Sequence, residues 1–273
     1  QMAKRAKLKQ IDYLLITHYH RDHVGGVPDL AQRIKIANFI DHGPNTEDTK
    51  VVKEDYSDYV KALQKGEHTV VKPGDTIPVK GLKVEVLTAN GNVLKSPPAG
   101  AGQPNSFCAS TPKKEDDPTE NARSTGVLVT FENFRFLDLG DLTWNKELEL
   151  MCPNNPIGTV DVYLTSHHGL NQSGSPALVD AVHPRVAIMN NGARKGGNPD
   201  AWQIVKDSPG IEDLWQLHYA LEGGKAHNVP DSFIANVDEH DQGDYLKLTA
   251  EGNGSFTVWN SRNKFQKVYK ANK

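Results

Sequence analysis

The chain has 273 residues, of which 37% are hydrophobic and 24% are charged. This balance is typical of a folded globular protein and excludes an intrinsically disordered chain. Lys and Arg number 31 against 34 Asp and Glu, giving a formal net charge of −3. Although four basic residues crowd the first ten positions, this charge gives no electrostatic footprint for tight non-specific binding of nucleic acid.

The first ninety residues are predicted to alternate between strands and helices. Apolar runs rich in Tyr, Ile and Val favour the extended state, and one segment has apolar residues at helical spacing. We expect strands at 12–17 and 36–40, helices at 29–34 and 56–63, and a strand meander at 70–71, 77–79 and 82–87.

Residues 90–120 differ in kind from the rest of the chain. They hold a Pro-Pro pair, several glycines and the charge run at 113–117, with almost nothing to bury. We therefore expect a long surface loop, and loops of this length inside a domain are usually functional or mobile.

Strands and helices alternate again after the loop. A strand hairpin is expected at 127–131 and 134–139, helices at 144–151 and 201–206, strands at 160–165, 186–188 and 214–217, and strand-like tail segments at 255–259 and 267–269. No internal repeat or linker divides the sequence, so the prediction is one α/β domain over residues 1–273.

Two classes of protein are not indicated. No run approaches the roughly 18 apolar residues of a membrane-spanning helix. Cys108 and Cys152 are too few for a disulfide framework and lack the spacing of a thiolate zinc site. They could form one bridge or none.

The HxHxDH segment at 18–23 follows the first predicted strand and carries the strongest chemical signal in the sequence. Its polar side chains cannot all be buried in a core without a shared partner. Imidazole and carboxylate groups suit zinc, iron or manganese. A tight turn after a strand can present His18 and His20 to one cation, and Asp22 and His23 to a neighbouring one.

Two later strand ends supply the same residue types. Asp141 follows a glycine at the end of the predicted hairpin, where it could bridge two cations or serve only as a turn aspartate. His167 and His168 directly follow the strand at 160–165 and supply the remaining imidazoles.

This order of strand ends resembles the metallo-β-lactamase superfamily over roughly residues 12–189. Three details resemble a narrower group: Asn-Ala-Arg-Ser at 121–124, Phe-Leu-Asp-Leu-Gly-Asp at 136–141 and Val-Asp-Val-Tyr-Leu-Thr-Ser-His-His-Gly at 160–169. The same features mark the hydrolase domain of ComEC-type competence (DNA-uptake) proteins. They are also similar to the choline-phosphate esterase that acts on cell-wall teichoic acids. The resemblance implies an αββα sandwich and phosphodiester chemistry.

The resemblance also implies two divalent cations, zinc in the first place, with manganese or iron as alternatives. The implied ligands are His18, His20 and Asp141 for one cation, and Asp22, His23, Asp141 and His168 for the other. Asp22 counts in addition among the catalytic residues.

Two departures from the superfamily pattern matter. Many members have one more histidine between the first motif and the Gly-Asp strand, where this chain offers only His42 and His68. His68 lies in a charged turn and is expected at the surface, whereas His42 could reach the cleft. The narrower group lacks this ligand too, which argues against a β-lactamase. The N-terminal hairpin of the fold is also missing before residue 12, so we expect that the sequence either starts mid-domain or has been trimmed, and that any signal peptide would have been lost with the hairpin.

The ligands imply a mechanism. Two cations sharing Asp141 would bind a water molecule between them and lower its pKa toward neutrality, giving a bridging hydroxide. His167 and His227 are candidates to protonate the leaving group, although His167 could equally hydrogen-bond at the rim and His227 could belong to a surface turn. Asn121 and Ser124 are expected to orient the ligands from behind, unless they only cap their turn.

The sequence thus predicts a dinuclear metal-dependent hydrolase of phosphoesters or phosphodiesters. A lactone or β-lactam hydrolase is the second interpretation, and a non-catalytic module that keeps its metals as a scaffold is the third. Phosphodiesters would need basic side chains near the metals, for which Arg123, Arg194 and Lys195 are candidates. The expected partner is a small-molecule or polymeric ester. The polar loops lean toward an exported protein, and the oligomeric state is open.

Overall fold

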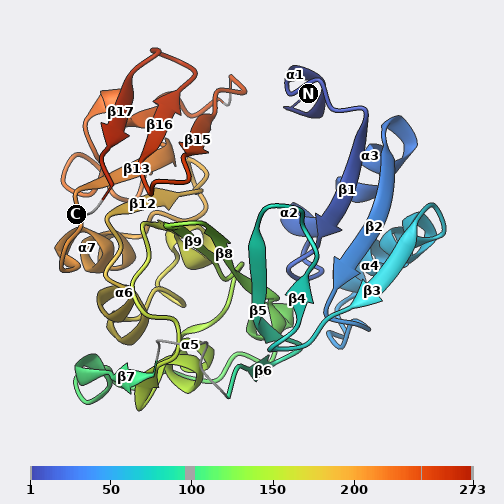
Figure 1. Cartoon of the computed structure of the whole chain (residues 1–273), viewed down its shortest axis with the longest axis horizontal. Helices are drawn as coiled ribbons and strands as arrows, with labels where there is room; N and C mark the ends of the chain where they lie inside the picture. The colour runs from blue at the N-terminus through green and yellow to red at the C-terminus, as the bar shows by residue number, and fades with distance from the viewer. Residues whose placement is uncertain (1, 96–101, 241, 272–273) are drawn as a thin grey trace.

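Parallel strands surround the segments that carry the predicted ligands (Figure 1). The computed structural model describes residues 2–95, 102–240 and 242–271. The helices are α1 (Met2–Arg5), α2 (Arg21–Val24), α3 (Val27–Arg33), α4 (Lys50–Leu63), α5 (Trp144–Met151), α6 (Pro176–Val182) and α7 (Pro199–Asp207), with 3-10 turns η1 (Ser106–Cys108), η2 (Glu120–Arg123), η3 (Ser166–Gly169) and η4 (Asp231–Phe233).

In the described part of the chain, the strands form one nine-stranded sheet, two three-stranded sheets and one two-stranded sheet. They are β1 (Gln10–Leu15), β2 (Lys35–Asp41), β3 (Glu67–Val70), β4 (Thr76–Ile77), β5 (Lys83–Ala89), β6 (Asn92–Val93), β7 (Gln103–Pro104), β8 (Gly126–Phe131), β9 (Phe134–Asp138), β10 (Asn154–Asn155), β11 (Val162–Leu164), β12 (Val186–Met189), β13 (Asp213–His218), β14 (Ile234–Asn236), β15 (Leu246–Ala250), β16 (Phe256–Asn260) and β17 (Gln266–Tyr269).

The first sheet has the order β1-β2-β3, with both pairs parallel. Its outer face packs on α2, α3 and α4 through a cluster that includes the fully buried Phe39 and Tyr59. The predicted meander is wrong at its first strand, because β3 pairs in parallel with β2 rather than with β4. The intervening α4 explains this, since a parallel connection needs a crossover of about a dozen residues or more.

The second sheet has the order β14-β13-β12-β11-β9-β8-β5-β4, with β6 paired to β5. The predicted hairpin is confirmed, with β8 and β9 antiparallel and Phe131 opposite Phe134. From β9 to β14 all neighbours are parallel. Helices α5, α6 and α7 cover one face of this parallel half, which explains the nearly continuous apolar runs of its strands.

The last three strands cover the other face of the parallel half. Their sheet has the order β15-β16-β17, and Tyr269 accepts a 2.8 Å hydrogen bond from the indole of the buried Trp215. The predicted tail strands correspond to β16 and β17. Strands β14 and β15 were not predicted, because β14 has only three residues and β15 is at most half-buried along its length.

The first sheet, β1-β2-β3, and the nine-stranded second sheet lie against each other through an apolar cluster. Ile40 of β2 packs there with Val84 and Val86 of β5 and Val127 of β8. Helices lie outside both sheets, so the predicted α/β sandwich is confirmed. In the described part of the chain, no helix combines the length and apolar character needed to cross a membrane.

The segment expected as a surface loop is partly anchored. Its described residues, 90–95 and 102–120, include β6, β7 and η1; residues 96–101 of the prediction lie outside the described chain. Cys108 forms a disulfide with Cys152 after α5, which answers the open question about the cysteines. The buried Asn105 donates to the carbonyls of Met151 and Ala177. The expectation that this segment buries almost nothing is therefore wrong.

Candidate metal centre

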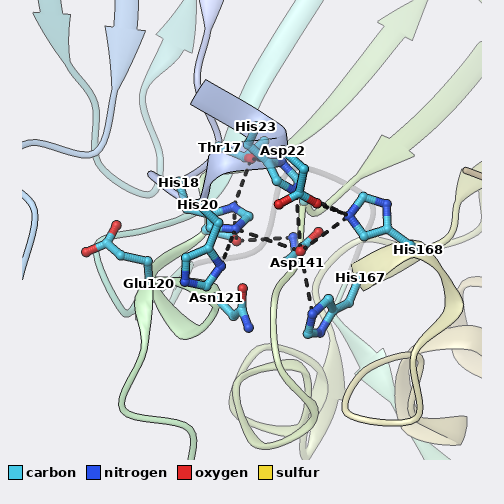
Figure 2. Close-up of polar contacts among 12 residues, drawn as sticks. Thr17, His18, His20, Asp22, His23, Glu120, Asn121, Asp141, His167 and His168 are labelled. Carbon is cyan, nitrogen blue, oxygen red and sulfur yellow. Dashed lines mark hydrogen bonds and ion pairs between the residues drawn. The ribbon is translucent and has the colours of Figure 1, made fainter. Parts of the chain in front are cut away.

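The predicted ligands lie at the carboxyl ends of strands from the first sheet and from the nine-stranded sheet (Figure 2). β1 leads into the HxHxDH segment, β9 into Asp141 and β11 into the two adjacent histidines. Side chains at the carboxyl ends of neighbouring parallel strands converge at one sheet edge. Gly140 lets the two sheets meet there: its φ is +57°, and a Cβ atom would come within 2.8 Å of the Thr17 Cβ.

The HxHxDH segment folds back on itself because a very short helix interrupts it. His20 is extended (φ −68°, ψ 149°), and α2 begins directly after it. His23 thereby returns next to His18, with their ring centroids 4.0 Å apart. The Thr17 hydroxyl lies 3.1 Å from the Nδ1 atoms of both His18 and His23. One threonine thus fixes two rings with their Nε2 atoms facing the same space.

Four residues form what we call the second ligand group: Asp22, His23, Asp141 and His168. Their four donor atoms all lie within 4.8 Å of one another. His168 Nε2 is 3.1 Å from Asp22 Oδ2, 3.3 Å from His23 Nε2 and 3.6 Å from Asp141 Oδ2. Strand ends 145 residues apart in sequence therefore present two imidazoles and two carboxylates to one point.

Three residues form the first ligand group: His18, His20 and the shared Asp141. His18 Nε2 lies 3.1 Å from His20 Nδ1 and 3.8 Å from Asp141 Oδ2. The Ser124 hydroxyl accepts a 3.1 Å hydrogen bond from the Asp141 backbone N–H and lies 3.4 Å from His18 Nδ1. Ser124 therefore occupies the supporting position expected for it.

The charge state of the cluster suits a divalent cation. Asp141 is only 2% exposed, and its Oδ2 has no hydrogen-bond partner although histidine nitrogens surround it. Burial would raise the pKa of Asp141, but the close His23 outweighs burial and holds that pKa well below its usual range. Burial lowers the pKa of His18 well below its ordinary value, so this ring is neutral at pH 7. A carboxylate oxygen without a partner, surrounded by imidazole nitrogens, is the donor set that a divalent metal takes.

The N-terminal part of the chain carries a family signature. A family model described as the metallo-β-lactamase superfamily matches residues 1–109, which include the HxHxDH segment. This part of the chain is therefore similar to the metallo-β-lactamase superfamily. The chain is also 24% identical over 190 residues to ComE operon protein 3 of Bacillus subtilis, a match that covers 68% of this chain. Because the match covers 20% of that relative, this chain spans about a fifth of its length.

Solved structures resemble this chain more distantly. The metallo-β-lactamase fold protein YhfI from Bacillus subtilis is 9% identical with a TM-score of 0.45, and the match covers 79% of each chain. CmlA, a diiron β-hydroxylase from Streptomyces venezuelae, is 15% identical with a TM-score of 0.40, covering 75% of this chain and 39% of that one.

The histidine turn at 166–169 has an unusual backbone. His167 and His168 both have positive φ (52° and 57°), a conformation that costs about 1–3 kcal/mol per residue when nothing supports it. The loop after β12 supplies support, since Gly197 N–H donates to the His168 carbonyl at 3.0 Å. His168 Nδ1 lies 3.1 Å from the Asn190 carbonyl, which leaves Nε2 facing the second ligand group.

Further residues hold the first ligand group from behind and were not predicted. Glu47 Oε2 lies 3.0 Å from His20 Nε2 and accepts a 3.0 Å hydrogen bond from the Glu120 backbone N–H. A carboxylate on the outer nitrogen of a ligand histidine fixes its tautomer and orientation. No motif marks Glu47, because its loop follows β2 and contacts His20 only in the folded chain.

Three histidines considered from the sequence contact other parts of the molecule. His42 is buried and lies 3.0 Å from Glu120 Oε2, so it supports the 120–124 segment instead of joining the ligands. The exposed His68 lies 2.8 Å from Asp41 Oδ2. His227, expected near the leaving group, packs its ring against Trp202 of α7 and forms no hydrogen bond or ion pair with either ligand group among the described residues. The structure therefore does not bring His227 to the cluster.

One of the three basic candidates reaches the ligands. Lys195, in the loop after β12, forms an ion pair with Asp22 while its side chain stays half-exposed. Arg194 instead pairs with Glu239 on the surface, and Arg123 donates to Asn90. Of the three candidates, Lys195 therefore supplies the ammonium group at the rim of the second ligand group.

Proposed function

We propose that this chain is a dinuclear metal-dependent hydrolase that acts on phosphoesters or phosphodiesters. The observation that carries the proposal is the shared carboxylate: Asp141 faces both ligand groups, and Lys195 adds a cationic side chain at their rim. Divalent cations bound there would supply Lewis-acid chemistry, polarising the ester and lowering the pKa of a water molecule. Zinc, manganese and iron all accept this mixture of imidazole and carboxylate.

The chain's own residues would orient the ester. Burial lowers the pKa of His167, whose Nε2 lies 3.6 Å from Asp141 Oδ2, so its ring is neutral at pH 7. A neutral ring is better suited to donate one N–H to a substrate oxygen than to store a proton for the leaving group. Lys195 can turn from Asp22 to an anionic oxygen, because its half-exposed side chain has room to move. Attraction for an anionic substrate therefore comes from Lys195 and the cations together.

The experiment compares three substrate classes on metal-loaded protein. We would measure bound metal by ICP-MS, and turnover of bis-(p-nitrophenyl) phosphate, a chromogenic cephalosporin and a lactone. The proposal expects about two metals per chain and phosphodiester turnover that Asp141→Ala abolishes. Turnover of only the cephalosporin or the lactone would replace the phosphoester by a cyclic amide or ester. Two metals without turnover of any substrate would favour the binding module.

A matched pair of lysine and arginine variants tests the phosphate part. Lys195→Met should raise KM for bis-(p-nitrophenyl) phosphate about tenfold, the equivalent of one charge-assisted contact of about 1.4 kcal/mol. Arg194→Met removes the neighbouring charge, which pairs with Glu239, and should leave KM unchanged. Equal KM values in the two variants would contradict the role given to Lys195.

The disulfide supports the further proposal that the protein works outside the reducing cytosol. Cys108 and Cys152 join the 102–120 segment to the end of α5, and structural disulfides persist mainly in oxidising compartments. Thiol alkylation of protein taken directly from cells, compared with and without reductant, tests this. Free thiols in the untreated sample would contradict it.

A further inference from the structure

The first ligand group offers fewer donors than the second. The second has four donor atoms, whereas the first has two imidazoles and the shared carboxylate. Neither His42 nor His68 completes it, since their rings contact Glu120 and Asp41. Between the HxHxDH segment and β8, a further protein donor must therefore come from a residue other than histidine.

Asn121 presents such a donor. It lies on η2 in the segment just before β8 and is only 8% exposed. Its Oδ1 atom is inaccessible to solvent and has no hydrogen-bond partner among the described residues. Figure 2 shows Asn121 beside His20 and Asp141, with its amide oxygen turned toward them.

An orphaned buried acceptor needs an explanation. Leaving a buried acceptor unpaired costs about 1–3 kcal/mol. Here Asp141 Oδ2 is orphaned as well, and two acceptor oxygens cannot hydrogen-bond to each other. A group that satisfies both must be a cation or a donor. His18 Nε2 lies 3.1 Å from His20 Nδ1 and 3.8 Å from Asp141 Oδ2, so imidazole donors already face this space and make a cation the better match.

We propose that Asn121 Oδ1 is a ligand of the cation held by His18, His20 and Asp141, in the place that a third histidine would otherwise take. The assignment rests on the proposed pair of cations but not on the substrate. An amide oxygen is a harder donor than an imidazole nitrogen. A site with this oxygen in place of a third imidazole therefore suits manganese better. The first ligand group is therefore expected to be the weaker zinc site and to accept Mn²⁺.

The neighbours of Asn121 hold it in position for this role. The Glu120 carboxylate accepts from the Thr46 backbone N–H at 3.0 Å, which fixes the start of η2. Glu47 contacts both the Glu120 backbone and His20, so Asn121 and His20 share one support. At the other end of the turn, Ser124 N–H donates to the Asn121 carbonyl at 3.1 Å. The amide is thus set by the same network that orients the imidazole.

Equilibrium Mn²⁺ titration of metal-free protein, followed by calorimetry and by the EPR signal of bound Mn²⁺, tests the assignment without any substrate. Wild type should bind two ions. Asn121→Leu should weaken one binding event about 10- to 100-fold and leave the other within threefold, whereas Asn121→Asp, which keeps an oxygen, should retain both. His20→Ala should weaken the same event as Asn121→Leu, and His168→Ala should weaken the other.

A neighbouring asparagine provides the control. Asn90 accepts a hydrogen bond from Arg123 and so contacts the same 3-10 turn. Asn90→Gly tolerates the positive φ of that position (49°) and should leave both binding events unchanged. Two binding events of wild-type affinity in Asn121→Leu would overturn the assignment, as would a wild type that binds fewer than two ions. Loss of one event without phosphodiester turnover in wild type would sustain the Asn121 ligand and reject only the proposed substrate.

Discussion

Glu147 should make the stability of the protein fall as the pH rises toward neutrality. This α5 residue is fully buried, and its carboxylate accepts from the N–H groups of Gly174 and Ser175 at 2.8 and 2.7 Å. Burial raises the pKa of Glu147 from 4.5 to about 7. Between these values the folded protein keeps a proton that the unfolded chain has lost. The free energy of unfolding therefore decreases as the pH rises through this window, by roughly 3 kcal/mol in total.

The assay is urea unfolding of metal-free protein at pH 4.5, 5.5, 6.5 and 7.5. Glu147→Gln is uncharged at every pH, so the stability of wild type relative to this variant should drop by roughly 3 kcal/mol across the series. Glu149→Gln on the same helix is the control: burial is outweighed by the hydrogen bonds and charges of Lys146 and Lys95, which together lower the pKa of Glu149, so the stability of wild type relative to this variant should not drop across the series. Parallel pH profiles for wild type and Glu147→Gln would refute the reasoning.

Three further changes test other parts of the structure. Glu47→Gln should weaken the Mn²⁺ binding event that His20→Ala also weakens, about 10-fold by calorimetry, because the outer nitrogen of His20 loses its carboxylate; unchanged affinity would show that Glu47 has no orienting role. Gly196→Ala should lower the free energy of unfolding by about 1–3 kcal/mol in urea, since φ is +84° and a Cβ would come 2.1 Å from a carbonyl of the histidine turn; wild-type stability would contradict that contact. Reducing the Cys108–Cys152 disulfide should lower the free energy of unfolding by about 2–4 kcal/mol, because the bond closes a loop with a sequence separation of 44 residues. Thermal or urea unfolding measures this loss, and an unchanged stability would mean that the loop stays anchored without the bond.

Local sequence predicted those elements whose signal is contained in their own residues. The helix over 144–151 and the hairpin around Glu132 and Asn133 follow from apolar periodicity and a two-residue turn, and both occur. Strand β3 went to the wrong partner, because pairing in parallel with β2 depends on a crossover helix and not on β3 itself. The 90–120 segment was judged from its polar composition. What anchors it is Asn105 and the disulfide, which bind the far end of α5.

In the candidate site too, residues with a local sequence signal were predicted, and residues that depend on contacts in the folded chain were not. Residues 18–23 could be predicted as metal ligands from the sequence, because histidine and aspartate at fixed offsets after a strand form a recognisable pattern within six positions. His227 had only a glycine-rich loop to suggest it, and the structure places its ring against Trp202. Glu47 had no local signal at all, since its only mark is a carboxylate 3.0 Å from a ring 27 residues away.

Asn121 lies between these two cases. Sequence reasoning placed it near the ligands without a reason to choose between a cap and a supporting role. The structure adds one fact that no pattern could contain: a buried amide oxygen without a partner, beside a carboxylate oxygen in the same condition. A buried acceptor that finds no partner in the folded chain indicates a donor or cation that the chain's own atoms do not supply. Because Asn121 lies beside His20 in Figure 2, we assign its oxygen to the first ligand group, where the histidine count is one short.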